Sequence, residues 1–269
     1  MPKVINSHFQ ISLKSTRPLE LIYSDVWGHA PIRSLDGFVY YVIFIDHFSK
    51  YIWLYPMKFK SDVFSIFGQF KSLVEKFFNL PIISFYSDNG GEFIKLKPLL
   101  ATHGISHFTS PPHTPELNGT VERRHRHIVE TGRTLLHHAN LPSQFWSYAF
   151  NTATYLINRM PTPNFSMQSP YQILFNNPPN YNHLHSFGCL CFPWLRPYTT
   201  NKLQNRSKPC IFLGYSNYHH TYLCLDHSTN RIYISRHVQF IENSFSYQIL
   251  TQLQQTPPAE LILDSPSYT

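Results

Sequence analysis

Four apolar, β-prone runs and one amphipathic helix follow one another in the N-terminal part of the chain. The helix is predicted over residues 61–79, where apolar side chains recur at helical spacing and Pro81 marks the end. Short connections with turn-forming residues between the first three runs favour antiparallel hairpins. The runs cover residues 21–27, 38–46, 50–56 and 81–86. This order predicts an α/β unit in which a sheet starts with hairpins and continues past a helix.

Three carboxylates stand at special places in this pattern. Asp25 lies inside the first run, where a charge is costly unless it meets a cation or a hydrogen-bond donor. Asp88 directly follows the fourth run, and Glu122 begins a polar helix after a turn-rich segment. Alone, either of the last two acids could be a turn residue or a helix cap. Together, the three suit Mg²⁺, which prefers oxygen ligands, and two such ions about 3.5–4 Å apart can hold both oxygens of a phosphodiester exchange.

Several longer stretches give these acids a family context. They are residues 24–28 (S-D-V-W-G), 87–93 (S-D-N-G-G-E-F), 114–123 (T-P-E-L-N-G-T-V-E-R), 145–146 (F-W), 158–161 (N-R-M-P) and 212–215 (F-L-G-Y). In these motifs and their order the chain resembles the integrases of Ty1/copia-type retrotransposons, which are part of a Pol polyprotein in the retroviral integrase superfamily. The resemblance implies an RNase H-like mixed five-stranded sheet with flanking helices, followed by a small β-rich SH3-like domain. It also implies an Asp-Asp-Glu triad of Asp25, Asp88 and Glu122 that binds two Mg²⁺ or Mn²⁺ ions.

The same resemblance implies a function. Integrases of this family process the 3′ ends of the element's cDNA and transfer the strands into host DNA. The expected partners are therefore DNA ends, target DNA and further copies of the chain on that DNA. The expected place of action is the nucleus, after assembly in cytoplasmic particles.

Basic residues around the third acid favour contact with DNA. The chain carries a formal charge of +7 with a pI near 9.2, which favours a polyanionic partner. A helix is predicted over residues 117–139, with an apolar stripe on one side and arginines beside Glu122. A solvated basic face is the alternative, but arginine forks suit phosphate oxygens. The expected DNA-binding residues are Asn118, Arg123, Arg124, Arg126 and Arg133, and Ser87 and Asn89 are expected to support the acids or face the DNA.

Changes in composition and in the spacing of apolar residues along the chain predict its domain organisation. A second long helix is expected over 142–159, and short β-prone runs follow at 187–194, 209–215, 221–226 and 231–240. The expected divisions are an N-terminal linker (1–18), a catalytic core (19–163), a linker (164–185), an SH3-like β domain (186–245) and a disordered tail (246–269), the tail being rich in Gln, Pro and Ser.

Other candidate sites in the sequence have structural interpretations. None of the cysteines forms a C-x-x-C pair, so Cys189 and Cys191 are expected to be small buried hydrophobes. Paired histidines such as His125 and His127 are interpreted as surface or structural residues, and Asp46 as a turn former. No apolar run approaches the ~20 residues of a membrane helix, so a soluble intracellular protein without a membrane partner is expected.

Two departures from the family pattern leave alternatives open. Only 33 residues separate Asp88 from Glu122, slightly fewer than the family usually has, and the chain begins after the family's zinc module. A catalytically inactive relic that only binds nucleic acid is therefore one alternative. A plain RNase H-type nuclease is another, although the Asn118-Gly119 pair before Val121-Glu122 favours an integrase.

Overall fold

The computed structural model describes residues 15–109, 115–198, 203, 205–216, 221–245 and 247. Within these ranges, the side chains of residues 115–118, 120, 164 and 197 are not described. The chain divides into two compact units, one formed by Met1–Ile128 with Thr154–Asn180 and the other by Val129–Ala153 with Tyr181–Thr269. Most of the expected N-terminal linker and nearly all of the expected tail lie outside the described residues.

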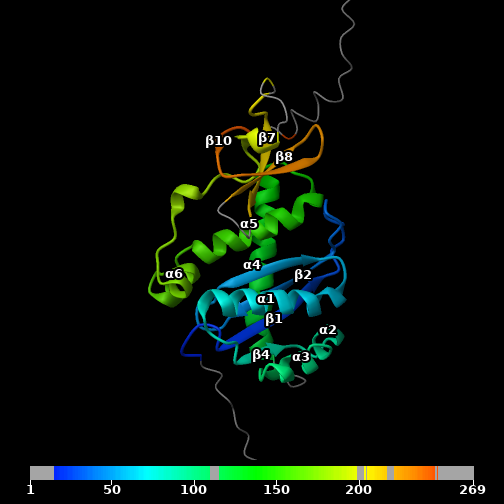
Figure 1. Cartoon of the computed structure of the whole chain (residues 1–269), viewed down its shortest axis with the longest axis vertical. Helices are drawn as coiled ribbons and strands as arrows, with labels where there is room; N and C mark the ends of the chain where they lie inside the picture. The colour runs from blue at the N-terminus through cyan, green and yellow to red at the C-terminus, as the bar shows by residue number, and fades with distance from the viewer. Residues whose placement is uncertain are drawn as a thin grey trace, which may run out of the picture. The chain divides into compact units, whose positions relative to one another are not determined.

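A five-stranded mixed sheet forms the centre of the first unit (Figure 1). Its strands are β1 (Leu21–Gly28), β2 (Tyr40–Asp46), β3 (Ile52–Met57), β4 (Ser84–Ser87) and β5 (Ser106–Thr109). Their order is β3-β2-β1-β4-β5, with the first three antiparallel and β4 and β5 parallel to β1. The predicted mixed sheet is confirmed, and the first and fourth strands are neighbours.

One face of this sheet packs against α1 (Val63–Phe78), the predicted amphipathic helix. Alternate strand residues such as Ile22, Phe44 and Phe85 point to that face and are fully buried. The rings of Phe44 and Phe70 stack with centroids 4.3 Å apart and an angle of 13°. Residues of opposite parity on the same strands, among them Asp25, therefore face away from α1.

Two short helices, α2 (Gly91–Ile94) and α3 (Lys97–Thr102), connect β4 to β5. Pro98 stands in the first turn of α3, where proline needs no hydrogen-bond partner for its nitrogen. The sequence also predicts a short helix near residues 95–103, which is present as α3, and α2 begins at Gly91, the second of the two glycines that follow Asp88.

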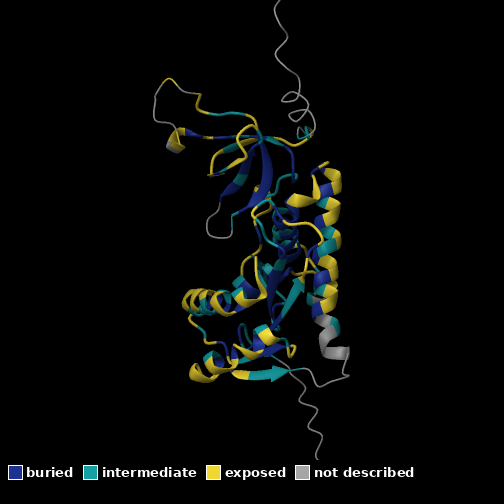
Figure 2. Ribbon diagram, turned by 90° about the vertical axis from the view of Figure 1, so that its right-hand side faces the viewer, coloured by how far each residue is buried: buried dark blue, intermediate teal, exposed yellow. Residues whose placement is uncertain are grey.

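The long helix α4 (Pro115–His138) has one buried side and one exposed side, as the alternating colours along it show (Figure 2). Among its described residues, the buried side chains are Val121, His125, Ile128 and Leu136. The sequence predicts an apolar stripe of Val121, Ile128, Leu135 and Ala139, but Leu135 is only half-buried and the buried His125 is not part of that stripe. A histidine takes an apolar position here because its ring has partners on the sheet, described below.

The edge of the sheet at β3 is closed by a side chain of α5 (Trp146–Arg159). Asn158 is 2 % exposed, and its Oδ1 accepts a hydrogen bond from the Ile52 N–H (2.9 Å) while its Nδ2 donates to the Ile52 carbonyl (2.8 Å). The neighbouring Arg159 places its guanidinium over the rings of Tyr155 (3.3 Å) and Tyr171 (4.7 Å). The first two residues of the N-R-M-P motif therefore have structural roles. Asn158 pairs the backbone N–H and carbonyl of Ile52 on an edge strand, and Arg159 packs on two tyrosine rings.

Asn158→Ala is expected to destabilise the first unit by about 2–3 kcal/mol, because it leaves the buried N–H and carbonyl of Ile52 without their partner. Chemical denaturation measures this loss. The matched control is Asn177→Ala, whose exposed amide bonds only to the nearby Phe175 carbonyl and whose loss should cost under about 0.5 kcal/mol. Equal stability of the two variants would contradict this role for Asn158.

The segment after α5 contains α6 (Pro170–Phe175) and short 3₁₀ turns at Pro163–Phe165 and Tyr181–His183. Ser169 caps α6, since its hydroxyl accepts a hydrogen bond from the Gln172 N–H at 3.1 Å. Phe175 packs edge-to-face on Tyr51 with centroids 5.6 Å apart. The sequence predicts a linker with a short helix at 169–175, and the segment contains this helix, which contacts the strand region of the first unit through Phe175.

The second unit contains an all-antiparallel five-stranded sheet with the order β10-β6-β7-β8-β9. Its strands are β6 (Leu190–Pro193), β7 (Cys210–Tyr215), β8 (Tyr222–Asp226), β9 (Arg231–Ser235) and β10 (Val238–Ile241). The single run predicted over 231–240 is wrong. It is two strands at opposite edges, and the Ser235 hydroxyl donates to the His237 carbonyl (3.0 Å) at the break. The apolar alternation continues through this reversal, which contains no glycine or proline.

The four cysteines are all buried free thiols in this unit, as expected for small hydrophobes. Cys191 and Cys210 are register partners on β6 and β7. Burial raises the pKa of Cys189 and of Cys210 to about 12. Buried protonated thiols of this kind pack as apolar groups and are poor nucleophiles.

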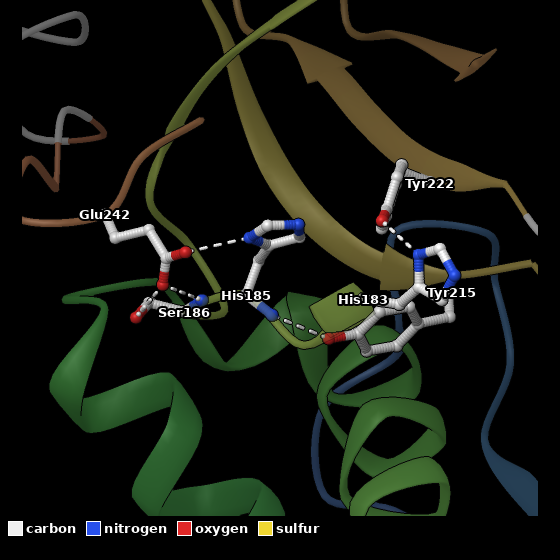
Figure 3. Close-up of polar contacts among 6 residues, drawn as sticks. All are labelled: His183, His185, Ser186, Tyr215, Tyr222 and Glu242. Carbon is white, nitrogen blue, oxygen red and sulfur yellow. Dashed lines mark hydrogen bonds and ion pairs between the residues drawn. The ribbon is translucent and has the colours of Figure 1, made fainter. Parts of the chain in front are cut away.

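A polar cluster fastens the chain entering β6 to this sheet (Figure 3). His185 Nδ1 lies 2.8 Å from Glu242 Oε1, and the Ser186 N–H and hydroxyl donate to Glu242 Oε2 at 3.0 and 2.9 Å. The hydrogen bond to His185 lowers the pKa of Glu242. The Tyr215 hydroxyl accepts from the His185 N–H (3.0 Å), and the His185 ring stacks on Phe240 at 3.6 Å. The entering segment therefore has a fixed place against β7 and the end of β10.

A buried carboxylate at the end of β8 organises the following turn. Asp226 is 2 % exposed and accepts hydrogen bonds from Lys208, from the Ser228 N–H and hydroxyl, and from Thr229. Burial opposes ionisation of Asp226, but these donors outweigh it and lower its pKa from 3.8 to about 2. The ionised Asp226 is thus a stabilising feature of the second unit.

Asp226→Asn is expected to lower the free energy of unfolding at pH 7 by about 2 kcal/mol, from a pKa difference of almost two units. A carboxyl group whose pKa is lower in the folded state stabilises the fold above its unfolded pKa. The gap between wild type and variant should therefore shrink as pH falls from about 4 towards 2. Denaturant titrations between pH 3 and 7 measure it, with the exposed Asp36→Asn as control. A gap that stays constant or widens on acidification contradicts this role.

Candidate active site

Asp25 and Asp88 lie side by side on neighbouring parallel strands. The register pairs Leu21 with Ser84 and Tyr23 with Tyr86, so the same offset places Asp88, one residue past the end of β4, beside Asp25. Adjacent strands are about 4.8 Å apart. Both acids have the parity of Tyr23 and Tyr86, whose rings touch at 5.0 Å, and so both lie on the side of the sheet away from α1.

Electrostatics around Asp88 disfavour its charge. Asp88 is exposed at the turn after β4, but partial burial of its carboxyl group raises its pKa, and a hydrogen bond from the Gly90 N–H to Oδ1 (2.9 Å) opposes the increase. The negative charges of Asp25 and Glu92 raise the pKa further, while Lys60 lowers it. A cation bound between neighbouring carboxylates reduces their repulsion and favours their charged forms.

Glu92, on the first turn of α2, is a further acid beside Asp88. A Cβ atom at Gly90 would lie 3.0 Å from both Asp88 Oδ1 and Glu92 Oε2, so the glycine keeps the two carboxylates close together. The Glu92 side chain is 10 % exposed, and Lys60 Nζ lies 3.4 Å from its Oε1. This lysine partly balances the acidic group at this edge of the sheet.

Asp25 is held from two directions. Its Oδ1 accepts a hydrogen bond from the Val26 N–H at 2.8 Å, and its Oδ2 lies 3.3 Å from Nε2 of His125 on α4. The side chain remains 31 % exposed. Asp25 thus faces α4 and keeps access to solvent, as a ligand of a hydrated ion must.

Glu122 is exposed on α4, one turn before His125. Residues three apart on a helix are neighbours on its surface, with Cβ atoms about 5–6 Å apart. The contact of His125 with Asp25 therefore brings Glu122 to the same region. Among the described side chains, no three His, Cys, Asp or Glu residues lie close enough to hold a metal ion. The structure thus pairs Asp25 with Asp88, and Glu122 lies one turn before His125 on α4 without forming a three-residue group with them among the described side chains.

The donor chemistry fits a hard divalent cation. All three predicted ligands offer carboxylate oxygens, which Mg²⁺ and Mn²⁺ prefer, and no thiol lies among them. The raised pKa of Asp88, caused by burial and by the charges of Asp25 and Glu92, is what a site for a cation shows before the cation binds.

The predicted DNA-binding arginines differ in exposure. Arg123, Arg126 and Arg133 are exposed along α4, and Arg133 belongs to the part of the helix in the second unit. Arg124 is half-buried, and burial followed by the charge of Arg123 lowers its pKa. The side chain of Asn118 lies outside the described residues, although its backbone is within α4.

The two predicted supporting residues take different places. Ser87 is 1 % exposed, and its hydroxyl lies 2.9 Å from His107 Nε2 and donates to the Asp88 carbonyl at 2.9 Å. It therefore holds the backbone of Asp88. Asn89 is exposed at the turn. Both roles near the acids remain predictions.

Sequence reasoning missed His125, Tyr41 and Glu92 as neighbours of the acids. His125 follows Glu122 by three residues, a spacing that places both on one side of a helix. Glu92 belongs to the S-D-N-G-G-E-F stretch. Tyr41 carried no sequence signal, because its contact depends on the pairing of β1 with β2.

Asp46, considered as a turn residue, has that role. It is fully buried, and its carboxylate accepts hydrogen bonds from the Leu19 N–H (2.9 Å) and from the Ser49 N–H and hydroxyl (2.8 and 2.6 Å). Burial, more than these bonds, shifts its pKa, which is raised. It therefore fastens the β2–β3 turn to the chain entering β1.

Two family models match the chain in the order of its two sheets. Residues 15–115 match the integrase core domain, and residues 189–253 match the retroviral polymerase SH3-like domain. The first match covers β1 to β5 with Asp25 and Asp88, and the second covers β6 to β10. The fold is thus that of an integrase core followed by an SH3-like domain.

Related proteins give the family more closely. The chain is 59 % identical over 236 residues to the Pol polyprotein from transposon RE2 of Arabidopsis thaliana, and 58 % identical over 238 residues to that from transposon RE1. It is 39 % identical over 227 residues to the Pol polyprotein from transposon TNT 1-94 of Nicotiana tabacum. These matches cover 84–88 % of the chain but only 16–17 % of the relatives. The chain belongs to the retrotransposon integrase family and spans a small part of the Pol polyproteins it matches.

The solved structures to which the chain is similar include two from retroviral integrases. One is the catalytic core domain of HTLV-2 integrase in complex with magnesium, with a TM-score of 0.46 and 23 % identity over 60 % of this chain and 99 % of that one. Another is a simian T-cell lymphotropic virus intasome in complex with the PP2A regulatory subunit B56 gamma, with a TM-score of 0.48 and 17 % identity over 85 % of this chain and 78 % of that one. In the part of the chain that the structure describes, no helix is long and apolar enough to cross a membrane.

Proposed function

We propose that the chain is the catalytic part of a retrotransposon integrase, which processes the 3′ ends of the element's cDNA and joins them to host DNA. The pairing of Asp25 with Asp88 on neighbouring strands carries this proposal. The integrase core match and the related Pol polyproteins support it. Asp25, Asp88 and Glu122 are the proposed ligands of two Mg²⁺ or Mn²⁺ ions. The ions would activate the attacking hydroxyl and stabilise the leaving oxygen.

Each protein group has a separate task in this proposal. Asp25 and Asp88 stand on the rigid sheet and fix one side of the site, while Glu122 contributes from α4. The Gly90 N–H fixes the Asp88 carboxylate, and Ser87 fixes its backbone carbonyl. The three acids would thus hold the ions, and the ions would hold the attacking and leaving oxygens for the exchange.

The basic residues are proposed to hold the DNA backbone. They lie along α4, the helix that also bears Glu122, and are Asn118, Arg123, Arg124, Arg126 and Arg133. Arg124 is half-buried, and its charge contributes to lowering the pKa of Lys50, after burial. A phosphate bound between Arg124 and Lys50 would reduce the repulsion between these two positive charges. The proposed assembly is a multimer on the DNA ends, acting in the nucleus.

A second candidate is a relic that binds nucleic acid without catalysis. The absence of a three-residue metal cluster among the described residues favours it, together with the short spacing from Asp88 to Glu122. This candidate predicts DNA binding that weakens steeply with salt and shows no metal-dependent turnover.

A labelled duplex that carries the element's own terminal sequence tests the proposal. With Mg²⁺ or Mn²⁺, the chain should shorten the 3′ end and join it to a target duplex, and chelation should stop both reactions. Binding of the duplex without either reaction favours the relic. Preferential cutting of RNA–DNA hybrids would instead indicate an RNase H-type nuclease.

A further inference from the structure

A chain of three side chains leads from the sheet to the first acid of the site. Nδ1 of His125 lies 2.9 Å from the Tyr41 hydroxyl, and Nε2 of the same ring lies 3.3 Å from Asp25 Oδ2. His125 is 8 % exposed and Tyr41 is fully buried. An imidazole on an otherwise apolar helix face is costly to bury unless both of its nitrogens have hydrogen-bond partners.

We propose that His125 is a positioning residue for Asp25, held by Tyr41 in the tautomer that carries its hydrogen on Nε2. The proposal rests on the function proposed above, in which Asp25 binds a divalent ion. In this role the His125 Nε2–H would fix the Oδ2 oxygen, while the Val26 N–H already fixes Oδ1. Each carboxylate oxygen has a further lone pair, so both remain able to bind an ion.

The tautomer follows from the partners of the ring. A carboxylate only accepts hydrogen bonds, so the nitrogen that faces Asp25 must carry the hydrogen. The other nitrogen then accepts from the Tyr41 hydroxyl. Burial, and then the negative charge of Asp25, raise the pKa of Tyr41, which therefore keeps its proton to donate.

Tyr41 is itself fixed by the sheet. It pairs in register with Trp27 between β2 and β1, and the two rings stack with centroids 5.0 Å apart at 21°. The His125 ring lies against the same tyrosine ring, with centroids 5.3 Å apart. The orientation of the imidazole is thus set by residues of the same two strands that carry and flank Asp25.

The contact between His125 and Asp25 is incomplete in the structure. Nε2 is buried, and no acceptor among the described residues stands in hydrogen-bonding geometry to it. Asp25 Oδ2 is within ion-pair distance but off the N–H direction. A small rotation of the carboxylate completes the bond, and binding of an ion by Asp25 supplies the reason for that rotation.

Direct titration with Mn²⁺, followed by electron paramagnetic resonance without DNA, tests the role. His125→Leu, which fills the space but donates nothing, should weaken the tightest Mn²⁺ binding by about 10–100-fold, as loss of an outer-shell partner does. His125→Gln, which keeps an N–H near the place of Nε2, should recover binding to within a few-fold of wild type. Folded His125→Leu protein that binds Mn²⁺ as wild type does would overturn the proposal, as would equal loss in both variants.

A second measurement is made on the wild-type chain and does not depend on the activity of any variant. The ¹⁵N shifts of the imidazole ring in the wild-type chain, assigned by comparison with His125→Gln, should show a protonated Nε2 and an unprotonated Nδ1. The reverse tautomer would overturn the proposal. Both readouts are independent of DNA cutting. A chain that binds Mn²⁺ as described but cuts no DNA contradicts the proposed function and leaves the role of His125 standing.

Discussion

Asp88→Asn is expected to reduce Mg²⁺-dependent cutting and joining of DNA by at least about 10²–10³-fold, the range seen when one group that stabilises transition-state charge is removed. The change keeps the shape of the side chain and its hydrogen bond from the Gly90 N–H. It removes the charge that, with Asp25, makes the site fit a divalent ion. Because Asp88 is exposed, the free energy of unfolding should change by less than about 0.5 kcal/mol.

Asp36→Asn is the matched control, since it removes an exposed carboxylate from the loop between β1 and β2 that is not one of the proposed ligands. It should cut and join DNA at the wild-type rate, and both variants should bind the duplex with unchanged affinity at moderate salt. Single-turnover rates with a labelled duplex measure the effect. Activity of Asp88→Asn within tenfold of the Asp36→Asn control would contradict the assignment of Asp88.

Gly214→Ala is expected to destabilise the second unit by about 2–5 kcal/mol, the sum of left-handed strain and overpacking. Gly214 has a φ of +109° beside a β-bulge in β7, and a Cβ atom there would lie 2.1 Å from Thr152 Oγ1. Thr152 belongs to the part of α5 that packs within the same unit. The glycine of the F-L-G-Y motif therefore permits close approach of a strand to a helix.

Gly104→Ala provides the matched control for Gly214→Ala. Gly104 also has a positive φ, of +67°, but its Cβ would meet nothing within 4 Å. Gly104→Ala should therefore lower the free energy of unfolding only by the backbone strain, about 1 kcal/mol. Thr152→Ala should recover part of the loss in the Gly214→Ala background, because it removes the clashing oxygen. Thermal or denaturant unfolding measures all of these variants, and a Gly214→Ala cost no larger than that of Gly104→Ala would contradict the packing argument.

The sequence predicts the first sheet well because its signals are local. Apolar, β-prone runs mark β1 to β4, helical spacing marks α1, and the pairing of Asp25 with Asp88 follows once β1 and β4 are neighbours. The boundary between β9 and β10 is missed because the reversal at Arg236 contains no glycine or proline and apolar residues recur on both sides of it. There the distant pairing of β10 with β6 decides the structure.

The surroundings of the acids are harder to predict than the acids themselves. His125 has the helical position of a core residue, and its partners Tyr41 and Asp25 come from two different strands. Asn158 is similar, because its partner Ile52 is 106 positions away in the chain. Such contacts are fixed by tertiary packing. The expected domain boundaries, the DNA contacts of the arginines and the triad itself remain predictions.

The central claim is that Asp25, Asp88 and Glu122 hold divalent ions against the phosphate that is cut. Sulfur in place of a non-bridging oxygen of that phosphate tests it most directly, because sulfur is a poor ligand for the hard Mg²⁺ and a better one for Mn²⁺. The wild-type chain should lose cutting of one sulfur diastereomer in Mg²⁺ and regain it in Mn²⁺, and Asp88→Asn should regain nothing. Undiminished cutting of both diastereomers in Mg²⁺, or full recovery of Asp88→Asn in Mn²⁺, would contradict the claim.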